Sequence, residues 1–532
     1  MTEKQISAVQ KAFLFFSNFV SSFLRGIRPF AKTRKRPRSK FGWWLGLLIV
    51  MIGIFSYLTN PFVKFSLVNT DNNRITLVDS SFTLEQVESP ILRDNAFSTQ
   101  LAVIKHGWHI VASKFAGGEK TEVTSVDQII RDIHALRFNP DLAFLISGDH
   151  FSMFYLRSLG IFYHSLLDPR TALDETDWKN RQLIYAKSLI YSLEVFSQSD
   201  RLTTTIVPIG PKSVALANFF AYPSDSLYSL LYAIEALQTD EINSIYNYQS
   251  LGQTYDLNTA ILAEKLLEQY KPTLQRHYKN YIDMVVDSET GLIRKDLQLS
   301  STKDSNIRES SFYDNIVLWR TKQLAMELGV IEDNQAELDT LKQKILDTFW
   351  LADEGYFLDH LSQKSIDQHY YSSDWLVAYM TGFLDPTDKV EQTYLIKSVE
   401  YVKRNALDRP FAIAYQPDLR KQELHFFPKY FAPTYASISL WSNWGMEYTK
   451  LMTSLAQATG DITYLNEAEL QIAAYSYNIR RYRGYPEVYN YEGDFFRQPF
   501  YKSIRRTGWV VSFEQARSML DWTKINWEEF TK

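Results

Sequence analysis

Apolar positions follow a helical period from about residue 125 to the C-terminus. Within this stretch apolar residues return every three or four positions, as they do on the buried face of an amphipathic helix. The pattern predicts twelve helices, over residues 125–136, 151–167, 176–199, 225–238, 256–287, 310–329, 335–350, 372–384, 391–407, 434–457, 462–480 and 508–520. Twelve consecutive helices can pair as six helical hairpins.

The predicted helices alternate in character. Every second helix is aromatic and carries few charges, whereas its neighbours, such as residues 256–287, are rich in Lys and Glu. This alternation indicates a repeat of one buried helix and one solvated helix. Six such repeats closed into a ring predict an all-α fold, an (α/α)6 toroid over residues 125–532, in which the weakly charged helices form the inner ring.

Aspartates open four of the inner helices: Asp149, Asp225, Asp314 and Asp374. Asp and Ser often cap helices, because their side chains accept hydrogen bonds from the free N–H groups of the first turn. In a toroid the N-termini of the inner helices also gather around one mouth. The four residues are therefore expected to be caps, functional groups around one concavity, or both.

A short β pattern precedes the helical stretch. The segments VKFSLV (63–68) and RITLVD (74–79) flank a turn-like sequence at 69–73. Two such segments around a short polar turn are typical of a hairpin. We therefore expect a β-rich lead-in over residues 61–124.

An uncharged apolar run extends over residues 41–58. Eighteen helical residues span about 27 Å, close to the roughly 30 Å of hydrocarbon in a bilayer. Aromatic residues at its two ends, Trp43, Trp44 and Tyr57, suit the membrane interfaces. A cleaved signal peptide needs a shorter apolar core and a small-x-small site, which SYLTNPF does not offer. The run predicts one retained transmembrane helix over residues 41–60.

The charge balance predicts the orientation of this helix. Residues 1–42 carry a net charge of +9 and the rest of the chain carries −13. Because basic residues flank the cytoplasmic end of a membrane helix, residues 1–40 are expected in the cytoplasm. The protein is then a single-pass protein of the cell membrane with an extracytoplasmic C-terminal domain. The acidic body also disfavours a nucleic-acid partner.

Several kinds of chemistry are absent from the sequence. The chain has no Cys, and its nine His residues form no HExxH motif. No Gly-rich phosphate loop of either common type occurs, so a nucleotide cofactor is not expected. We predict neither a metal nor a cofactor. His150 and His164 lie in an apolar segment and are interpreted as hydrogen-bonded core residues.

Three stretches combine carboxylates with aromatic residues. They are RESSFYDN (308–315), YYSSDW (370–375) and GYPEVYNYEGD (484–494), and the last leads to RRTGW (505–509). Sugars need this mixture, because their C–H faces stack on aromatic rings while their hydroxyls bond to carboxylates, Arg and Asn. Glycoside hydrolysis usually needs two carboxyl groups, one that donates a proton and one that activates water or attacks the sugar.

On these residues the chain resembles the six-hairpin glycosidases, the group of trehalases, glucoamylases and processing α-glucosidases. RESSFYDN looks like the ES-x-x-D(N) stretch of the trehalase and processing-glucosidase branch, in which the Asp is the general acid; the resemblance assigns that role to Asp314. FWLADEGYFLDHL (349–361) resembles the recurring hairpin of the group. The branch places its base before the last inner helix, which implies Glu487, with Glu492 second.

The resemblance covers residues 125–520, and the chain departs from the family pattern at two points. Ser311 stands where the family's ESG motif has Gly, and the Gly-rich segment around the base is missing.

The predicted site is therefore a sugar site with Asp314 and Glu487 as catalytic residues. The residues expected to bind the sugar are Asp149, Glu309, Tyr313, Asp374, Trp375, Tyr485, Glu492, Arg506 and Trp509.

Three functions fit this sequence. The first is a membrane-anchored glycoside hydrolase that acts on glucan-like or exopolysaccharide chains outside the cytoplasm, and the sequence favours it. The second is a non-catalytic carbohydrate-binding or envelope-assembly protein that keeps the toroid without a matched acid and base. The third is a polysaccharide lyase, for which the base and the residue that neutralises a uronate would come from His425, Tyr430, Tyr435 and Asn443.

Overall fold

The computed structural model describes the chain from Ile91 onward, with gaps. The described residues are 91–92, 96–135, 138–139, 144–210, 213–218, 221–238, 259–300, 302, 306–362, 370–499 and 501–531. All of them belong to one compact unit, Pro61–Lys532. The predicted basic segment, membrane helix and hairpin of residues 63–79 lie outside the described residues. Among the helices that are described, none has the length and apolarity needed to cross a bilayer.

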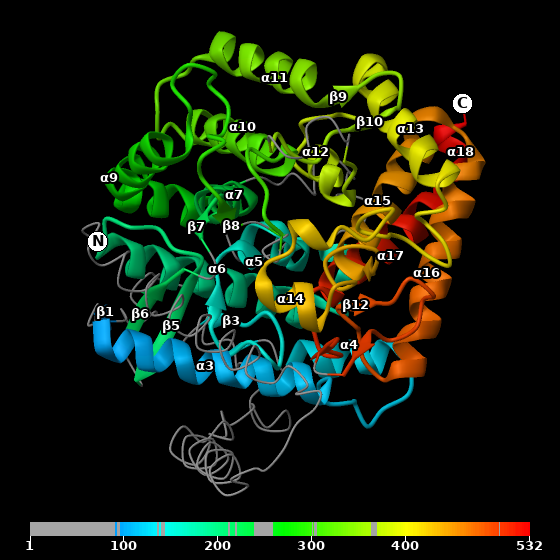
Figure 1. Ribbon diagram of the computed structural model, residues 1–532, viewed down its shortest axis with the longest axis horizontal. Helices are drawn as coiled ribbons and strands as arrows, with labels where there is room; N and C mark the ends of the chain where they lie inside the picture. Colours follow the sequence, from blue (N-terminus) through cyan, green and yellow to red (C-terminus); the bar gives the residue numbers. More distant parts are fainter. Residues whose placement is uncertain are drawn as a thin grey trace, which may run out of the picture. The chain divides into compact units, whose positions relative to one another are not determined.

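Two layers of helices alternate along the chain from α4 onward (Figure 1). The outer helices are α4 (Val126–Ala135), α6 (Glu175–Ser197), α9 (Thr259–Val285), α11 (Gln335–Phe349), α13 (Lys389–Arg404) and α16 (Ile462–Tyr482). The inner helices are α5 (Arg157–Ile161), α7 (Ser226–Gln238), α10 (Phe312–Glu327), α12 (Val377–Met380), α15 (Ser442–Thr459) and α17 (Val510–Ile525). Shorter helical pieces are η2 (Tyr163–Leu167), η3 (Pro169–Thr171), η6 (Ser373–Leu376), η7 (Lys421–Glu423), α14 (Phe426–Phe431) and α18 (Trp527–Phe530).

The inner helices form a closed ring. Contacts run from α5 to α7, from α7 to α10 and from α10 to α12. The turn η6, which leads into α12, contacts α15; α15 contacts α17, and α17 returns to η2, which continues α5. In the outer layer α16, the last helix, also contacts α4, the first. This closure confirms the predicted toroid of six hairpins.

Composition explains which helices are inner. In α10 every residue from Phe312 to Trp319 is buried, so water touches almost none of its first two turns. In α11 only one stripe is buried, at Leu338, Leu341, Ile345 and Phe349. A helix that is apolar all round needs neighbours on every side, whereas an amphipathic helix needs them on one face.

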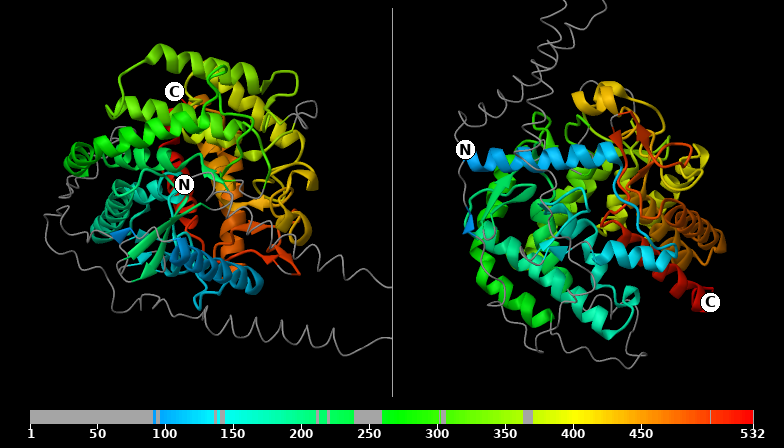
Figure 2. Two further views of the ribbon diagram at one scale, coloured as in Figure 1. Left: turned by 60° about the vertical axis from the view of Figure 1, so that its left-hand side comes forward. Right: turned by 90° about the horizontal axis from the view of Figure 1, so that it is seen from below.

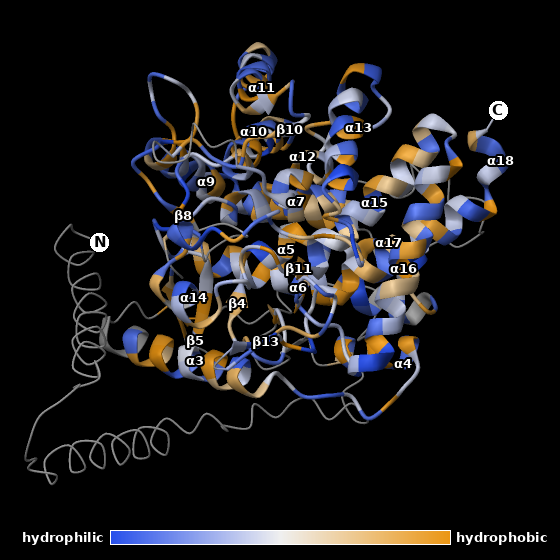
Figure 3. Ribbon diagram, turned by 45° about the vertical axis from the view of Figure 1, so that its right-hand side comes forward, coloured by the Kyte–Doolittle hydropathy of each residue, from blue (hydrophilic) through white to orange (hydrophobic). Residues whose placement is uncertain are grey.

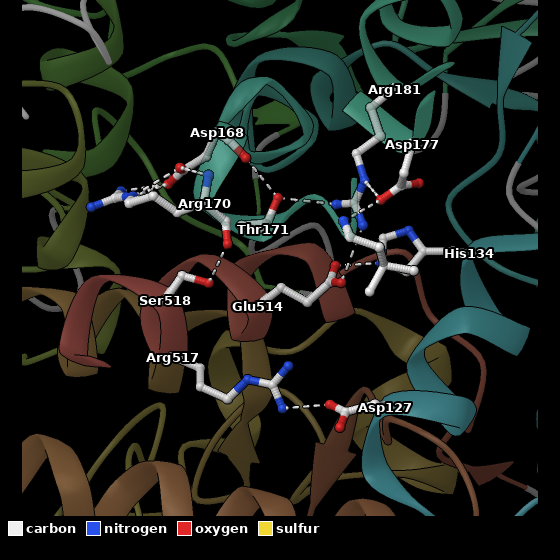
Figure 4. A network of polar contacts seen from close by, with 11 residues as sticks. Asp127, His134, Asp168, Arg170, Thr171, Asp177, Arg181, Glu514, Arg517 and Ser518 are labelled. Carbon is white, nitrogen blue, oxygen red and sulfur yellow. Dashed lines mark hydrogen bonds and ion pairs between the residues drawn. The ribbon is translucent and has the colours of Figure 1, made fainter. Parts of the chain in front are cut away.

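Buried charges join the two ends of the ring (Figure 4). Glu514 on α17 forms an ion pair with His134 on α4, and its other oxygen lies 3.5 Å from the guanidinium of Arg181 on α6. A more exposed pair joins Arg517 on α17 to Asp127 on α4 at 2.8 Å. The last inner helix is thus held to the first two outer helices.

Strands are short and lie between the helices. The largest sheet has the order β1-β6-β5-β4, with β1 (Ile91–Leu92), β4 (Phe154–Tyr155), β5 (Thr205–Gly210) and β6 (Ser213–Ala217). Two-stranded pairs are β2–β3 (Phe138–Asn139, Phe144–Leu145), β7–β8 (Tyr222–Pro223, Leu299–Ser300), β9–β10 (Trp350–Leu351, Tyr356–Phe357), β11–β12 (Leu440–Trp441, Val488–Tyr489) and β13–β14 (Arg497–Gln498, Tyr501–Lys502).

The lead-in segment differs from the prediction. Most of its described part is a helix, α3 (Ala96–Ala116), and only β1 is a strand. In Figures 1 and 2, α3 runs along one side of the helical body, where it contacts β5, β6 and β14. The β pattern occurs instead inside the toroid sequence, in the β5–β6 hairpin between α6 and α7.

We expect substitution of Glu514 to weaken closure of the ring. In Glu514→Gln the buried carboxylate that contacts His134 and Arg181 is lost, while Arg181 keeps Asp177 at 2.9 Å, so we expect a cost of about 1–3 kcal/mol. Denaturant unfolding should show this loss. As a control, Glu469→Gln removes the exposed 2.6 Å pair with Lys524 and should cost less than about 1 kcal/mol. Equal stabilities of the two variants would contradict a closing role for Glu514.

Candidate functional site

A cavity of about 260 Å³ opens where the first residues of several inner helices meet. It receives residues from α3, from the 147–162 segment that contains the start of α5, from the start of α15 and from the segment before α17. The described lining residues are Ile110, Lys114, Ser147, His150, Phe151, Tyr155, Arg157, Ser158, Ile161, Phe162, Thr302, Tyr435, Ala436, Trp441, Asn443, Glu487, Tyr501, Thr507 and Trp509. The cavity therefore lies at the predicted mouth of the ring.

Glu487 is the one carboxylate among the described lining residues. Its backbone is fixed on both sides: its N–H donates to the carbonyl of Ile504 at 2.9 Å, and its carbonyl accepts from the Ser442 hydroxyl at 2.9 Å. The antiparallel pair β11–β12 brings these segments together. The predicted base thus occupies the cavity on a rigid backbone.

Lys114 from α3 forms a buried ion pair with the Glu487 carboxylate. The ammonium also donates to the Tyr435 hydroxyl at 3.2 Å and lies 5.2 Å from the centre of the Tyr501 ring. Burial alone lowers the pKa of Lys114, but attraction to Glu487 and Tyr501 leaves that pKa raised above its ordinary value. Lys114 is therefore an ammonium at neutral pH.

The turn after α3 is fixed to the ring by two arginines. The Arg505 guanidinium donates to the carbonyls of Gly117 and Gly118, and Arg506 lies 3.1 Å from the Glu119 carboxylate. Gly118 has φ +68°, and a Cβ there would lie 3.1 Å from the Arg505 backbone nitrogen, so this turn requires Gly. Arg506, predicted to bind the sugar, instead holds the helix that delivers Lys114.

Aromatic rings form one wall of the cavity. The rings of Trp441 and Trp509 have centroids 5.8 Å apart, Tyr435 packs against Trp441 at 5.0 Å, and Phe162 against Trp509 at 6.0 Å. Of the predicted sugar-binding residues, Trp509 is the one in this wall. Such a surface suits the C–H face of a sugar ring.

Two lining residues have buried polar atoms without hydrogen-bond partners among the described residues: Nδ1 of His150 and Oδ1 of Asn443. Burial, helped by the charge of Lys114, holds the pKa of His150 well below its ordinary value. A neutral imidazole has one donor and one acceptor, and buried polar atoms normally find partners. A bound hydroxyl group can supply them. His150, expected to be a satisfied core residue, is therefore a candidate ligand contact.

Asp314 lies in the first turn of α10 and does not appear among the described lining residues. Its backbone N–H donates to the Ser311 hydroxyl at 3.0 Å, and that hydroxyl lies 2.5 Å from the Asp314 carboxylate. This is a capping arrangement. Ser311 is therefore the N-cap of α10, and Asp314, expected to be a cap, is instead the third residue of the helix. Burial raises the pKa of Asp314, although Arg308 and Ser311 oppose the shift.

The starts of the neighbouring inner helices hold further buried carboxylates. Asp225, just before α7, accepts from the Tyr313 hydroxyl at 3.0 Å and pairs with Arg157 at 2.7 Å. Because Arg157 lines the cavity, Asp225 and Tyr313 lie directly behind its wall. Asp374 in η6 pairs with Arg308 at 2.7 Å.

Asp149 does not open a helix. It lies in the turn before β4, and α5 begins only at Arg157, because Phe154 and Tyr155 are taken up by the strand pair with β5. Burial raises the pKa of Asp149 to about 6, against the attraction of Arg506.

The other predicted sugar-binding residues lie outside the described lining. Trp375 is buried and donates to the Tyr371 hydroxyl at 3.0 Å, and Tyr485 is buried and donates to the Ser442 carbonyl at 3.2 Å. Glu309 is half-buried, and Glu492 is exposed in the turn after β12. Glu492 is therefore exposed to solvent and does not line the cavity, whereas Glu487 does.

One cluster among the described residues has the donor types of a metal site. Ligand atoms of Asp359, His360 and Glu423 lie within 4.8 Å of one another. Arg308 donates to Asp359 at 2.8 Å, so part of the negative charge of this cluster is already neutralised.

No family model and no curated protein matches the chain. Solved structures do align. A rhamnosidase from Klebsiella oxytoca with rhamnose bound is 14% identical, with a TM-score of 0.43 over 75% of this chain, which spans 65% of the length of the rhamnosidase. A mannosylglycerate hydrolase of family GH63 from Thermus thermophilus is 11% identical, with a TM-score of 0.44 over 75% of this chain and 100% of its own. Cellobiose 2-epimerase from Bacillus thermoamylovorans is 11% identical, with a TM-score of 0.46 over 75% of this chain and 99% of its own.

The chain is thus similar to a rhamnosidase, a mannosylglycerate hydrolase and a sugar epimerase. At these TM-scores the alignments are likenesses only. The assignment of the fold rests on the closed ring of helices.

We expect Lys114→Met to destabilise the protein by about 3–5 kcal/mol, because it leaves the Glu487 carboxylate buried without its ammonium. Adding Glu487→Gln should recover part of this loss. Lys120→Met, at an exposed position after α3, is the control and should change the free energy of unfolding by less than about 0.5 kcal/mol. A double variant that is no more stable than Lys114→Met would contradict the pairing.

The pH dependence of the same pair has a defined sign. The folded-state pKa of Lys114 is raised above 10.5, so its contribution is complete below pH 10.5 and is lost as the pH rises through the folded-state pKa. Wild-type stability should therefore fall more steeply than that of Lys114→Met above this pH.

Proposed function

We propose that this protein is a glycoside hydrolase that acts on glucan-like or envelope polysaccharide chains at the mouth of the toroid. The observation that supports this most is Glu487, an ionised carboxylate on a fixed backbone inside an aromatic-walled cavity. Sugar recognition is assigned to the Trp441 and Trp509 rings and to the polar atoms of His150 and Asn443.

Glu487 is suited to act as the base. An ionised carboxylate can accept a proton from water, whereas a general acid must begin protonated. Lys114 carries its own proton and favours the ionised form of its partner. In the proposed step, water attacks the anomeric carbon, its proton passes to Glu487, and the leaving oxygen receives a proton from the acid.

Asp314 is the proposed acid. Burial raises its pKa, the direction that a general acid requires. An inverting enzyme holds its two carboxyls about 6.5–9.5 Å apart with water between them. Asp314 is not among the described lining residues, so this role requires the scissile bond to reach the start of α10.

A non-catalytic carbohydrate-binding protein is the second candidate. It is favoured by one observation: the described lining contains a single carboxylate, while Asp314 is engaged in a helix cap with Ser311. A lyase has less support. Tyr435 and Asn443 do reach the cavity, but the lining cations Lys114 and Arg157 are paired with Glu487 and Asp225 and are not set to neutralise a uronate.

We also propose that residues 41–60 anchor the protein in the cell membrane as a single span, with residues 1–40 in the cytoplasm. The uncharged run and the +9 charge of residues 1–42 support this topology.

Asp314→Asn tests the hydrolytic proposal. The variant keeps the shape of the side chain but cannot donate the proton, so turnover of an unactivated glycoside should fall by about 10²–10⁴-fold. Sugar affinity and the unfolding midpoint should change little. Turnover and affinity are measured on the same oligosaccharide.

Glu492→Gln is the matched control, since this carboxylate is exposed and lies outside the cavity; its turnover should equal that of wild type. Unchanged turnover in Asp314→Asn would assign the acid to another residue. A wild-type protein that binds oligosaccharides but cleaves none would support the binding function instead.

Protease added to intact cells tests the topology. The body should be digested while residues 1–40 stay protected, because the charge asymmetry places the basic segment inside. A cytoplasmic marker protein must remain intact in the same sample. Full protection of the body, in cells whose outer surface is open to protease, would contradict the proposed orientation.

A further inference from the structure

The outward face of α3 is apolar. Leu101, Ile104, Val111 and Phe115 have exposed fractions of 50%, 48%, 46% and 53%. With the half-buried Trp108 they follow one another at intervals of 3, 4, 3 and 4 residues. Residues at this spacing form a single stripe along a helix. Hydrophobic segments recur along α3 in Figure 3.

The face of α3 toward the body is mixed. Ala102 is buried against Met153 and Val207. His106 is buried, and its ring nitrogens lie 2.7 Å from the Ser152 hydroxyl and 3.2 Å from the Pro208 carbonyl. Lys114 is buried against Glu487. The apolar stripe is therefore additional to the face by which α3 packs on the body.

This stripe is unusual for the molecule. Among the described residues α3 exposes four large apolar side chains on one face, more than any other helix; α16 exposes three, Ile462, Leu470 and Tyr477. Contiguous exposed apolar surface marks an interaction site, while single exposed residues need no explanation.

The composition of the stripe and its place in the chain point to a lipid surface. Helices that lie in a membrane interface carry Trp, Phe and aliphatic residues on one face, with cations at its edge. The Lys502 ammonium lies 5.5 Å from the centre of the Phe115 ring, at the edge of the stripe. The predicted membrane helix ends roughly 30 residues before β1. That length of chain reaches at most about 100 Å, so an anchored body stays close to the bilayer.

We propose that α3 lies in the interface of the bilayer, with Leu101, Ile104, Trp108, Val111 and Phe115 facing the acyl boundary. The proposal rests on the proposed membrane anchor. Because the same helix also supplies Lys114 to the cavity, docking places the cavity next to the membrane surface. The substrate chains are then those that lie close to the bilayer or emerge from it.

A single labelled cysteine tests the proposal in the full-length protein, because the chain has no Cys of its own. Ile104→Cys carries an environment-sensitive fluorophore, and the protein is reconstituted into vesicles of phosphatidylcholine and phosphatidylglycerol at 3:1. The control is Leu470→Cys on α16, an exposed position of similar chemistry with an exposed fraction of 61%. Quenching by nitroxide-labelled lipid and by aqueous iodide is measured at both positions.

The label at position 104 should emit at shorter wavelength, be quenched by the nitroxide lipid and resist iodide, while the label at position 470 shows the reverse. Equal iodide quenching at both positions would overturn the proposal. The proposal would also be overturned if the label at position 104 resisted iodide without lipid and did so more strongly at higher protein concentration. A second copy of the protein would then cover the stripe.

Flotation of the vesicles separates this inference from the proposed anchor. Protein that floats with the vesicles but shows an aqueous label at position 104 overturns the docking of α3 and leaves the anchor intact. Protein that does not float overturns both.

Discussion

Lys114 and Glu487 bury opposite charges where a helix outside the ring meets the segment before the last inner helix. Taking two ions out of water costs several kcal/mol each, and their attraction repays this only when the geometry is good and further hydrogen bonds are made. Tyr435 and Tyr501 surround the ammonium and supply such contacts. The pair therefore acts as a constraint: α3 cannot dock on the body without delivering its cation to the cavity.

The cavity depends equally on closure of the ring. Its walls come from stretches near residues 150, 440 and 500, which meet because α17 returns to the start of the toroid. Glu514 fixes this return through His134 and Arg181. One set of buried charges closes the ring, and another completes its mouth. In each case one carboxylate, Glu514 or Glu487, pairs with a cation more than 300 residues earlier in the chain.

The sequence predicts the ring well, because burial is reflected in composition: the first two turns of α10 are mostly aromatic and aliphatic and are buried on all sides, whereas α11 is buried on one face. It does not predict α3, because that helix carries apolar residues on two faces, one against the body and one exposed, and buries His106 and Lys114. Within the site, Glu487 and Trp509 follow from their position before the last inner helix. Trp375 and Tyr485 carry the same carboxylate-and-aromatic signal but pack in the interior. A single sequence does not distinguish an aromatic cavity wall from an aromatic core.

The central claim is that the Glu487 cavity is where a sugar binds. A crystal structure of the protein soaked with a glucan oligosaccharide tests it most directly. We predict a sugar ring against Trp441 and Trp509, with hydroxyl oxygens within hydrogen-bond distance of His150 Nδ1, Asn443 and the Glu487 carboxylate. An oligosaccharide bound on another face, with the cavity filled only by water, would contradict the account.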